Sequence, residues 1–213
     1  MPATPDVDGA WSRLETALAD AVPSLLADLA PPASATDLDA LAERTDLDGR
    51  PALDNLYGHH DGQRSPTPGV FFGLQFLPAV AAADEWNRWA SMVQDDPALV
   101  SDVVVQSEPV GDVQPVYFSP SWVPFAVDGA GNGLAVDLAP GPGGVTGQVI
   151  SFGADETVRR VLAPSVAAFL AWCASAWESG EATVVDDPDA VGGQAPRIRG
   201  ASHLLDVADE LFG

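Results

Sequence analysis

The chain contains no lysine, and nine arginines are its only basic residues apart from three histidines. Its 31 acidic residues bring the formal net charge to −22. A surface this negative repels the phosphates of nucleic acids and anionic lipid headgroups, and it attracts basic proteins. We therefore expect neither a nucleic-acid nor a membrane partner. A GC-rich genome or adaptation to high salt would produce the same composition, so the charge alone does not establish a basic protein partner.

Cysteine and histidine are also scarce. The one cysteine, Cys173, cannot form an intramolecular disulfide, so we expect a fold without cross-links and a reducing, cytoplasmic location. Zinc and related metals need several converging His or Cys ligands, so we expect no metal and no cofactor. No apolar run approaches the roughly 18 residues that span a bilayer, and the first residues lack the pattern of an export signal.

The hydrophobic content of 46%, with six Trp and eight Phe, is sufficient for a buried core. Apolar residues recur at helical spacing from Trp11 to Leu29, and Pro23 should break this helix into two pieces. The segment from Val166 to Trp177 has the most regular amphipathic pattern. Further helices are expected over 34–46, 51–57 and 78–94, with a short terminal helix within 201–212.

Strand patterns occupy the middle of the chain. Gly69 to Leu77 is aromatic and bounded by turn formers, which is typical of a buried strand. Short connections between the later candidates favour antiparallel neighbours, because a parallel crossover needs a dozen or more residues. These candidates are 122–127, 134–138, 148–152 and 157–162. Residues 95–114 show no clean period, and we expect a loop with short irregular pieces there. The sequence also loses periodicity over 180–200.

The glycine-rich run after Asp128 superficially resembles two kinds of ligand loop. It fails as a calcium loop, because Ala130 replaces an oxygen ligand and Ala139 stands where the bidentate Glu should be. It fails as a phosphate cradle, because Gly133 leads into a strand and not a helix. We therefore expect a tight hairpin that needs positive φ angles.

No pattern in the chain predicts a catalytic group. A Gly-x-Ser-x-Gly nucleophile motif is missing, and Cys173 falls on the buried face of its helix. Carboxylates are numerous enough that an acid and base pair could exist, so a hydrolase stays as a minor alternative. We expect a binding protein and no enzyme.

The order of these features resembles one known family. The chain combines a Trp in its first helix, a His-Asp-Gly-Gln turn, an aromatic segment and the run W-x-P-F-x-x-D-G-x-G-N-x-x-x-x-D-x-x-P-G-x-x-G. This combination is similar to the SUKH superfamily, in its branch named for fungal cell-wall regulators of the Smi/Knr type. The resemblance covers about residues 9–178. The matching residues that we take as candidate partner contacts are Asp61, Gly62, Trp122, Pro124, Phe125, Asp128, Gly131, Asn132, Asp137 and Pro140.

The resemblance implies an α+β fold in which helices from both ends of the chain flank a mostly antiparallel sheet, without known catalysis. Bacterial members resemble immunity proteins that neutralise protein toxins, many of them nucleases, whereas fungal members act as scaffolds in cell-wall synthesis. An immunity role with a basic toxin as partner is our first expectation, and a scaffold in envelope assembly is the alternative. We divide the chain into a polar leader (1–8), the family domain (9–179) and an appendage (180–213).

Physical roles can be expected for the motif residues without any partner. Trp122 and Phe125 should anchor a strand, and Pro124 should mark an edge or a bulge, because it cannot donate to the ladder. Asp128 and Asn132 should hold the hairpin through bonds to backbone amides. Asp137 should lie on the sheet face opposite Leu134 and Val136, because residues alternate along a strand.

Overall fold

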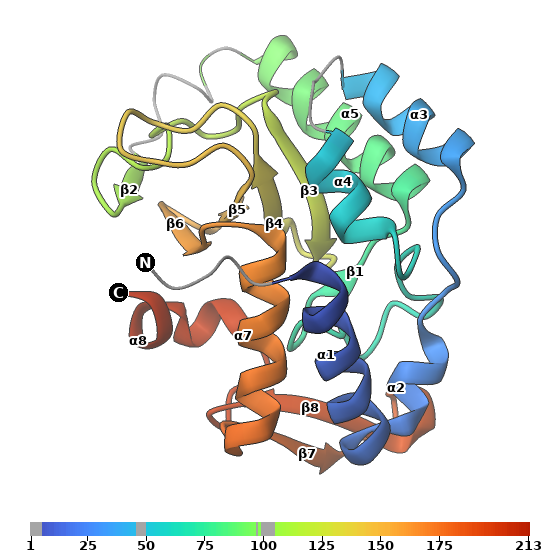
Figure 1. The fold of residues 1–213 in the computed structure, drawn as a ribbon. Helices are drawn as coiled ribbons and strands as arrows, with labels where there is room; N and C mark the ends of the chain where they lie inside the picture. Colours follow the sequence, from blue (N-terminus) through green and yellow to red (C-terminus); the bar gives the residue numbers. More distant parts are fainter. Residues whose placement is uncertain (1–5, 46–49, 97, 99–104) are drawn as a thin grey trace.

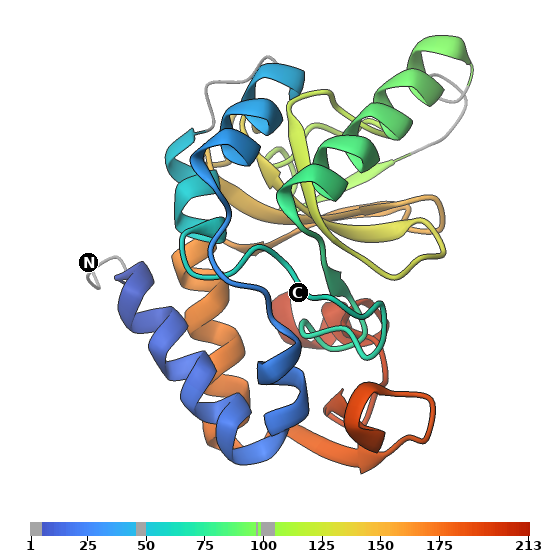
Figure 2. The ribbon, with the colours of Figure 1, turned by 90° about the vertical axis from the view of Figure 1, so that its right-hand side faces the viewer.

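The computed structural model describes residues 6–45, 50–96, 98 and 105–213. Figures 1 and 2 show a six-stranded sheet with helices on both faces and a separate two-stranded sheet at the lower end of the molecule. This architecture confirms the expected α+β fold with a mostly antiparallel sheet. Within the described ranges, no helix is both long and apolar enough to cross a membrane.

The helices begin and end where local chemistry predicts. The Asp6 carboxylate accepts a hydrogen bond from the Gly9 N–H at the start of α1, and Ser165 caps α7 in the same way. Pro23 occupies the first turn of α2, so the expected break between two helical pieces is confirmed. The described α-helices are α1 (Val7–Ala21), α2 (Pro23–Asp28), α3 (Ala35–Thr45), α4 (Arg50–Tyr57), α5 (Ala79–Asp95), α7 (Val166–Ser179) and α8 (Ala208–Phe212).

The main sheet has the strand order β1-β3-β4-β5-β6-β2. Its strands are β1 (Gln75–Phe76), β2 (Gln106–Glu108), β3 (Trp122–Val127), β4 (Asn132–Asp137), β5 (Gln148–Gly153) and β6 (Val158–Ala163). The four strands from β3 to β6 form the expected antiparallel meander. Strand β2 pairs parallel with β6, and it lies in residues 95–114, where we expected a loop with short irregular pieces.

Both faces of the sheet are buried. Leu134 and Val136 belong to the larger apolar cluster, which contains residues of α1 and α7, whereas Ala135 belongs to a second cluster around Trp89 of α5. Burial on both faces explains why strands β3 to β5 contain nearly continuous apolar residues.

The expectation of a strand from Gly69 to Leu77 was largely wrong, because only β1 is extended there. The chain turns back on itself before β1, and the Phe71 and Leu74 backbones pair with each other. A Cβ on Gly69 would lie 2.2 Å from the carbonyl carbon of Leu74. The aromatic residues of this segment therefore enter the core from a compact turn.

The last segment, which shows no periodicity in the sequence, contains regular secondary structure. It forms a hairpin of β7 (Ala182–Asp186) and β8 (Gln194–Ile198), followed by the expected short terminal helix, α8. Ile198 and Leu204 are buried in the larger cluster, and the Leu204 N–H donates to the Phe72 carbonyl over 2.9 Å. Residues 180–213 therefore share the core of the rest, while the division at 179/180 stays a prediction.

Candidate functional site

The β3–β4 turn is organised around one carboxylate, that of Asp128. Its Oδ1 accepts hydrogen bonds from the N–H groups of Ala130, Gly131 and Asn132, at 2.7, 3.0 and 3.0 Å. Its Oδ2 accepts a fourth bond from the Asn132 side chain over 2.9 Å. Each carboxylate oxygen has about two acceptor positions, so the three bonds saturate Oδ1, while Oδ2 accepts one bond and keeps room for a further contact. The carboxylate of Asp128 therefore holds the turn together through bonds to the turn's own backbone.

The surroundings of Asp128 favour its ionised form. Burial opposes ionisation, but the hydrogen bonds from Asn132 and Ala130 and the nearby His203 together lower the pKa of Asp128. His203 Nε2 lies 3.6 Å from Asp128 Oδ2. The motif turn is thereby connected to the C-terminal segment, a contact that the sequence spacing did not reveal.

A second polar cluster lies at the other end of the same hairpin, where Asp137 pairs in register with Trp122. Asp137 is 0% exposed, and it accepts hydrogen bonds from the Gln148 side chain (3.0 Å) and the Ala139 N–H (3.1 Å). Gln148 also donates to the Asp112 carbonyl over 2.9 Å. Burial raises the pKa of Asp137 to about 6, although the hydrogen bonds from Gln148 and Ala139 act to lower it. Asp137 and Gln148 therefore connect two loops to the sheet, and neither presents a reactive group to solvent.

Asp137 lies on the sheet face opposite Leu134 and Val136, as expected. That face is also covered, because Ala135 beside it belongs to the second apolar cluster. This explains how a carboxylate comes to be fully buried in a strand whose other residues are apolar.

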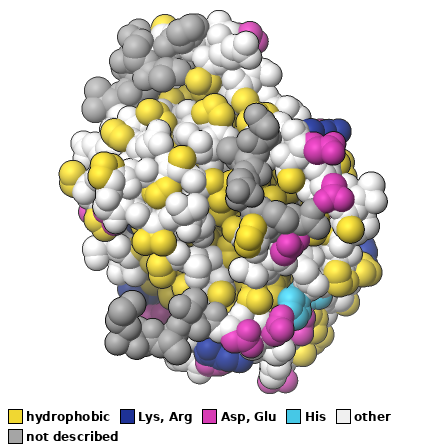
Figure 3. Space-filling model, turned by 45° about the horizontal axis from the view of Figure 1, so that its top comes forward, with side chains coloured by type: hydrophobic (Ala, Val, Ile, Leu, Met, Phe, Trp, Pro, Cys, Tyr) yellow, Lys and Arg dark blue, Asp and Glu magenta, His cyan; other side chains and the backbone are white. Residues whose placement is uncertain are grey.

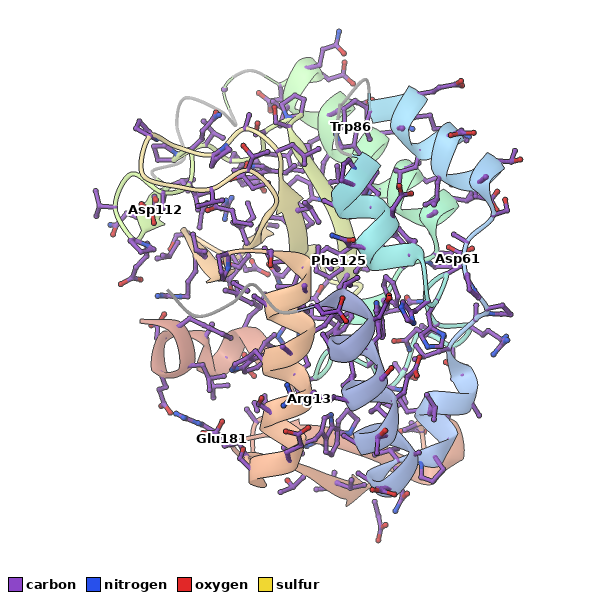
Figure 4. All side chains as sticks on the ribbon, viewed as in Figure 1. Arg13, Asp61, Trp86, Asp112, Phe125 and Glu181 are labelled. Carbon is purple, nitrogen blue, oxygen red and sulfur yellow. The ribbon has the colours of Figure 1, made fainter. Side chains whose placement is uncertain are left out.

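The apolar motif residues lie on both sides of the sheet. Trp122 packs edge-on against Phe118 in the second cluster, whereas Phe125 lies between Phe71 and Phe169 in the first (Figure 4). Pro124 precedes a shift of register in the β3–β4 pair, and β1 pairs only with the following residues, 126 and 127. Pro124 therefore satisfies both expectations, since it lies beside a bulge and beyond the end of β1.

Asp61 and Gly62 lie apart from the hairpin cluster of Asp128. Asp61 Oδ1 accepts a hydrogen bond from the Ala79 N–H over 2.7 Å at the start of α5. Gly62 has a φ of +72°, and a Cβ there would lie 2.3 Å from the Pro78 nitrogen. Only glycine fits this approach of two backbone segments.

The predicted site residues therefore do not converge on one ligand site. Asp128, Gly131 and Asn132 form the turn, while Trp122 and Asp137 lie at the far end of the hairpin. Pro140 lies in the following loop, where a Cβ on Gly144 would come within 2.7 Å of it. Their contact with a partner stays a prediction.

Two cavities open on the surface, and one of them lies beside the motif turn. A groove of about 520 Å³ runs between α1 and α7, and Arg13 crosses it to reach Glu178 at 2.5 Å and Ser175 at 2.9 Å (Figure 4). A smaller cavity of about 320 Å³ lies between α5 and the β3–β4 turn, where it is lined by Arg88, Glu85 and the backbone of 129–131. Both cavities are open to the surface and have charged residues at their rims. Among the described residues, no group of three or more His, Cys, Asp and Glu is arranged to hold a metal.

The charge is distributed unevenly. On the face in Figure 3, hydrophobic and uncharged side chains cover most of the surface, and the carboxylates lie toward its right and lower margins. A net charge of −22 therefore does not produce a uniformly acidic shell. Part of the surface is available for contacts that involve little charge.

Two arginines outside the family motif also organise the structure. Arg159 is 0% exposed, and its guanidinium donates to the backbone carbonyls of Tyr117 (2.6 Å) and Gly153 (3.3 Å). Burial lowers the pKa of Arg159 to about 10. Arg160 binds Glu108 of β2 at 2.5 Å and also Asp209 of α8. Their position in the sequence could have indicated this role, because two adjacent arginines inside a predicted strand must find partners if they are buried.

Comparison with known proteins identifies similar chains. Residues 32–172 match the model of the SMI1 / KNR4 family (SUKH-1). The cell wall biosynthesis/cell cycle regulator smi1 of Schizosaccharomyces pombe is 34% identical over 88% of this chain and 39% of its own length. The glucan synthesis regulatory protein of Neurospora crassa is 31% identical over 87% and 41%, and the cell wall assembly regulator SMI1 of Saccharomyces cerevisiae is 29% identical over 84% and 42%. The chain spans about two fifths of the length of these relatives.

Proposed function

Because the chain belongs to the SMI1/KNR4 family (SUKH-1), we propose that it is a regulatory protein that acts by binding other proteins in envelope or cell-wall assembly, without catalysis. The named relatives are regulators of cell-wall and glucan synthesis. This agrees with the scaffold that the sequence placed second, and it favours that function over toxin immunity.

The proposal rests on the observation that the polar groups of the motif bind other groups of the same chain. Asp128 accepts four hydrogen bonds within its own turn, and the side chain of Asp137 in β4 is fully buried. A general acid or base must reach its substrate within hydrogen-bond distance, directly or through one water. Asp137, whose pKa of about 6 would suit acid and base chemistry, has no exposed surface for that contact. The motif residues are therefore better suited to stabilise a binding protein than to catalyse a reaction.

Capture from the source cells tests the proposal. The tagged chain, cross-linked in living cells and analysed by mass spectrometry, should enrich several proteins of envelope assembly. An unrelated protein of the same net charge is the control for purely ionic capture, because basic proteins adhere to any strongly acidic chain. If the chain enriches no protein above that control, the proposal fails.

The immunity role is a second candidate, and the net charge of −22 favours it. Nuclease sites that grip phosphate are basic, and an acidic surface can steer toward them and cover them. Under this candidate, co-expression with a toxin encoded beside the gene should restore growth and yield a stoichiometric complex. Several envelope proteins without a dedicated toxin would instead support the regulator.

A further inference from the structure

The C-terminal hairpin β7–β8 forms a sheet of two strands, so each strand has an outer edge. The two edges differ. On β8, Pro196 has no N–H to offer, and the Ile198 N–H donates to the Ala201 carbonyl over 3.0 Å. A proline and a covering loop are two of the ways in which proteins block an edge strand. The outer edge of β8 is therefore blocked at Pro196 and Ile198.

The hydrogen-bond alternation shows which groups of β7 face outward. The Arg199 N–H donates to the Glu181 carbonyl over 2.8 Å, and the Asp187 N–H donates to the Gly193 carbonyl over 2.9 Å. These residues oppose each other in the same register as β7 and β8, so every second pair is hydrogen-bonded. Val184 faces Pro196, which fits a pair that is not bonded. The N–H and C=O groups of Ala182, Val184 and Asp186 therefore point away from β8.

No neighbour within the described ranges satisfies those outward groups through a hydrogen bond. Asp186 is exposed and Val184 is half-buried, whereas Ala182 is buried, so the accessible part of the edge lies at Val184 and Asp186. Figures 1 and 2 place β7 at the lower end of the molecule, where the turn between α1 and α2 reaches the same level. Such an edge is a template for another strand, because its backbone groups already have the spacing of a ladder.

The side chains around the edge define the partner. Thr183 and Val185 are exposed on one face, Val185 to 36%, and the carboxylates of Glu181 and Asp187 flank them at the same alternation. The Glu181 carboxylate also binds Arg199 at 2.7 Å, so Asp187 is the less neutralised of the two (Figure 4 shows Glu181). Antiparallel pairing of two copies centred on Val184 would place Glu181 opposite Asp187. Because like charges directly opposite are destabilising, a second copy is disfavoured.

We propose that the outer edge of β7 binds an extended segment of a partner protein as a third strand, with basic residues of that segment opposite Glu181 and Asp187. The inference rests on the proposed function, and it adds the surface and the chemistry of the partner. Backbone bonds to Val184 and Asp186 supply the attachment, and the two carboxylates select for arginine or lysine.

A capped peptide with arginine at each end and alternating threonine and valine between them is the probe, spaced so that the arginines reach Glu181 and Asp187. Titration into the isotope-labelled full chain should shift the amide resonances of Val184 and Asp186 in nuclear magnetic resonance spectra. The same peptide with glutamate at both ends is the matched control and should bind about tenfold more weakly. Equal binding of both peptides, or shifts confined to another surface, overturns the inference.

Two variants separate the edge from the fold. Val184→Pro removes an outward N–H, as Pro196 does on β8, and should weaken binding about tenfold or more. Asp187→Arg retains the backbone edge and should reverse the preference toward the glutamate peptide. Circular dichroism melting verifies that each variant is folded, and Asp187→Arg remains informative if Val184→Pro does not fold.

Capture from cells distinguishes failure of this inference from failure of the proposed function. If Val184→Pro is folded and retains all partners of the unaltered chain, partner binding stands but the edge is not its site. If the unaltered chain captures no partner yet binds the arginine peptide, the edge stands and the regulatory function fails. Loss of the captured partners in both variants, with folding retained, is the expected result.

Discussion

The molecule contains two hairpins of opposite character. In β3–β4 the turn carboxylate accepts four hydrogen bonds, both sheet faces are covered, and the aromatic residues enter two cores. In β7–β8 the side chains of Thr183 and Val185 are exposed, and the outer edge of β7 has backbone groups without a hydrogen bond among the described residues. The family motif belongs to the first hairpin. The comparison teaches that a distinctive sequence motif can belong to the structural core. The backbone groups that we propose for partner binding lie instead in a segment without a recognisable motif.

The largest contrast is expected between core and edge side chains. Phe125→Ala should lower the free energy of unfolding by about 3–5 kcal/mol, because a buried ring between Phe71 and Phe169 is replaced by a cavity. Val185→Ala, on the exposed face of β7, should change it by less than about 0.5 kcal/mol. Urea unfolding curves measure both, and similar losses would contradict the division between the hairpins.

Glycine positions sharpen the same contrast within the motif. Gly62→Ala should cost about 3–4 kcal/mol, because the new Cβ meets the Pro78 nitrogen at a positive φ. Gly129→Ala has a φ of +77° but open space around the Cβ, so it should cost only about 1–2 kcal/mol. Thermal unfolding of the two variants gives the comparison, and an equal cost would show that Gly62 is not tightly enclosed.

The buried carboxylate predicts a pH dependence of defined sign. The pKa of Asp137 is raised from 3.8 to about 6, so the folded state holds its proton more tightly than the unfolded state. Its contribution to stability is full below the unfolded value and is lost as the pH rises through about 6, a change of about 3 kcal/mol. Asp137→Asn should remove this dependence. Unfolding free energies of both proteins between about pH 4 and pH 7 should therefore differ in slope.

Asp128 is a control, because its ionisation should change the free energy of unfolding with pH in the opposite direction. Its pKa is lowered from 3.8, so its ionised form stabilises the fold above that value, and this contribution is lost as the pH falls below it. Asp128→Asn should therefore cost stability at neutral pH and cost less in acid. Parallel pH profiles for the Asp137 and Asp128 variants would contradict the assigned environments.

The smallest effect is expected on the surface between α1 and α7. Arg13 and Glu178 are about half exposed, and such pairs contribute less than about 1 kcal/mol. Arg13→Gln should therefore shift the unfolding midpoint slightly in low salt and hardly at all in high salt. A loss that is large and independent of salt would mean that Arg13 supports the packing of the two helices.

Sequence patterns predicted most helices and the meander, because periodicity and proline act locally. Val166 to Trp177 and the break at Pro23 are examples. The compact turn before β1 was missed, since an aromatic run does not reveal that Gly69 must meet Leu74. The β7–β8 hairpin was missed because Pro196 and the exposed residues of β7 break the usual strand pattern. Its open edge depends on which strand lies outside, and only the assembled fold decides that.

Only the local part of the site was predicted from the sequence, because contacts between distant segments depend on the assembled fold. The hydrogen bonds of Asp128 and Asn132 are local and were expected, as was the face on which Asp137 lies. The partners of the buried groups come from distant segments, as Gln148 shows for Asp137. Sequence spacing cannot show such partners, so burial and the shifted pKa of Asp137 were not foreseen.

Hydrogen exchange of the chain, alone and bound to a captured partner, tests most directly whether the motif is framework and the β7 edge is the binding surface. The account predicts that the amides of Val184 and Asp186 exchange rapidly in the free chain and become protected in the complex. The amides of Ala130, Gly131 and Asn132, already bonded to Asp128, should be protected in both states. Protection gained at the β3–β4 turn, with no change along β7, would contradict the account.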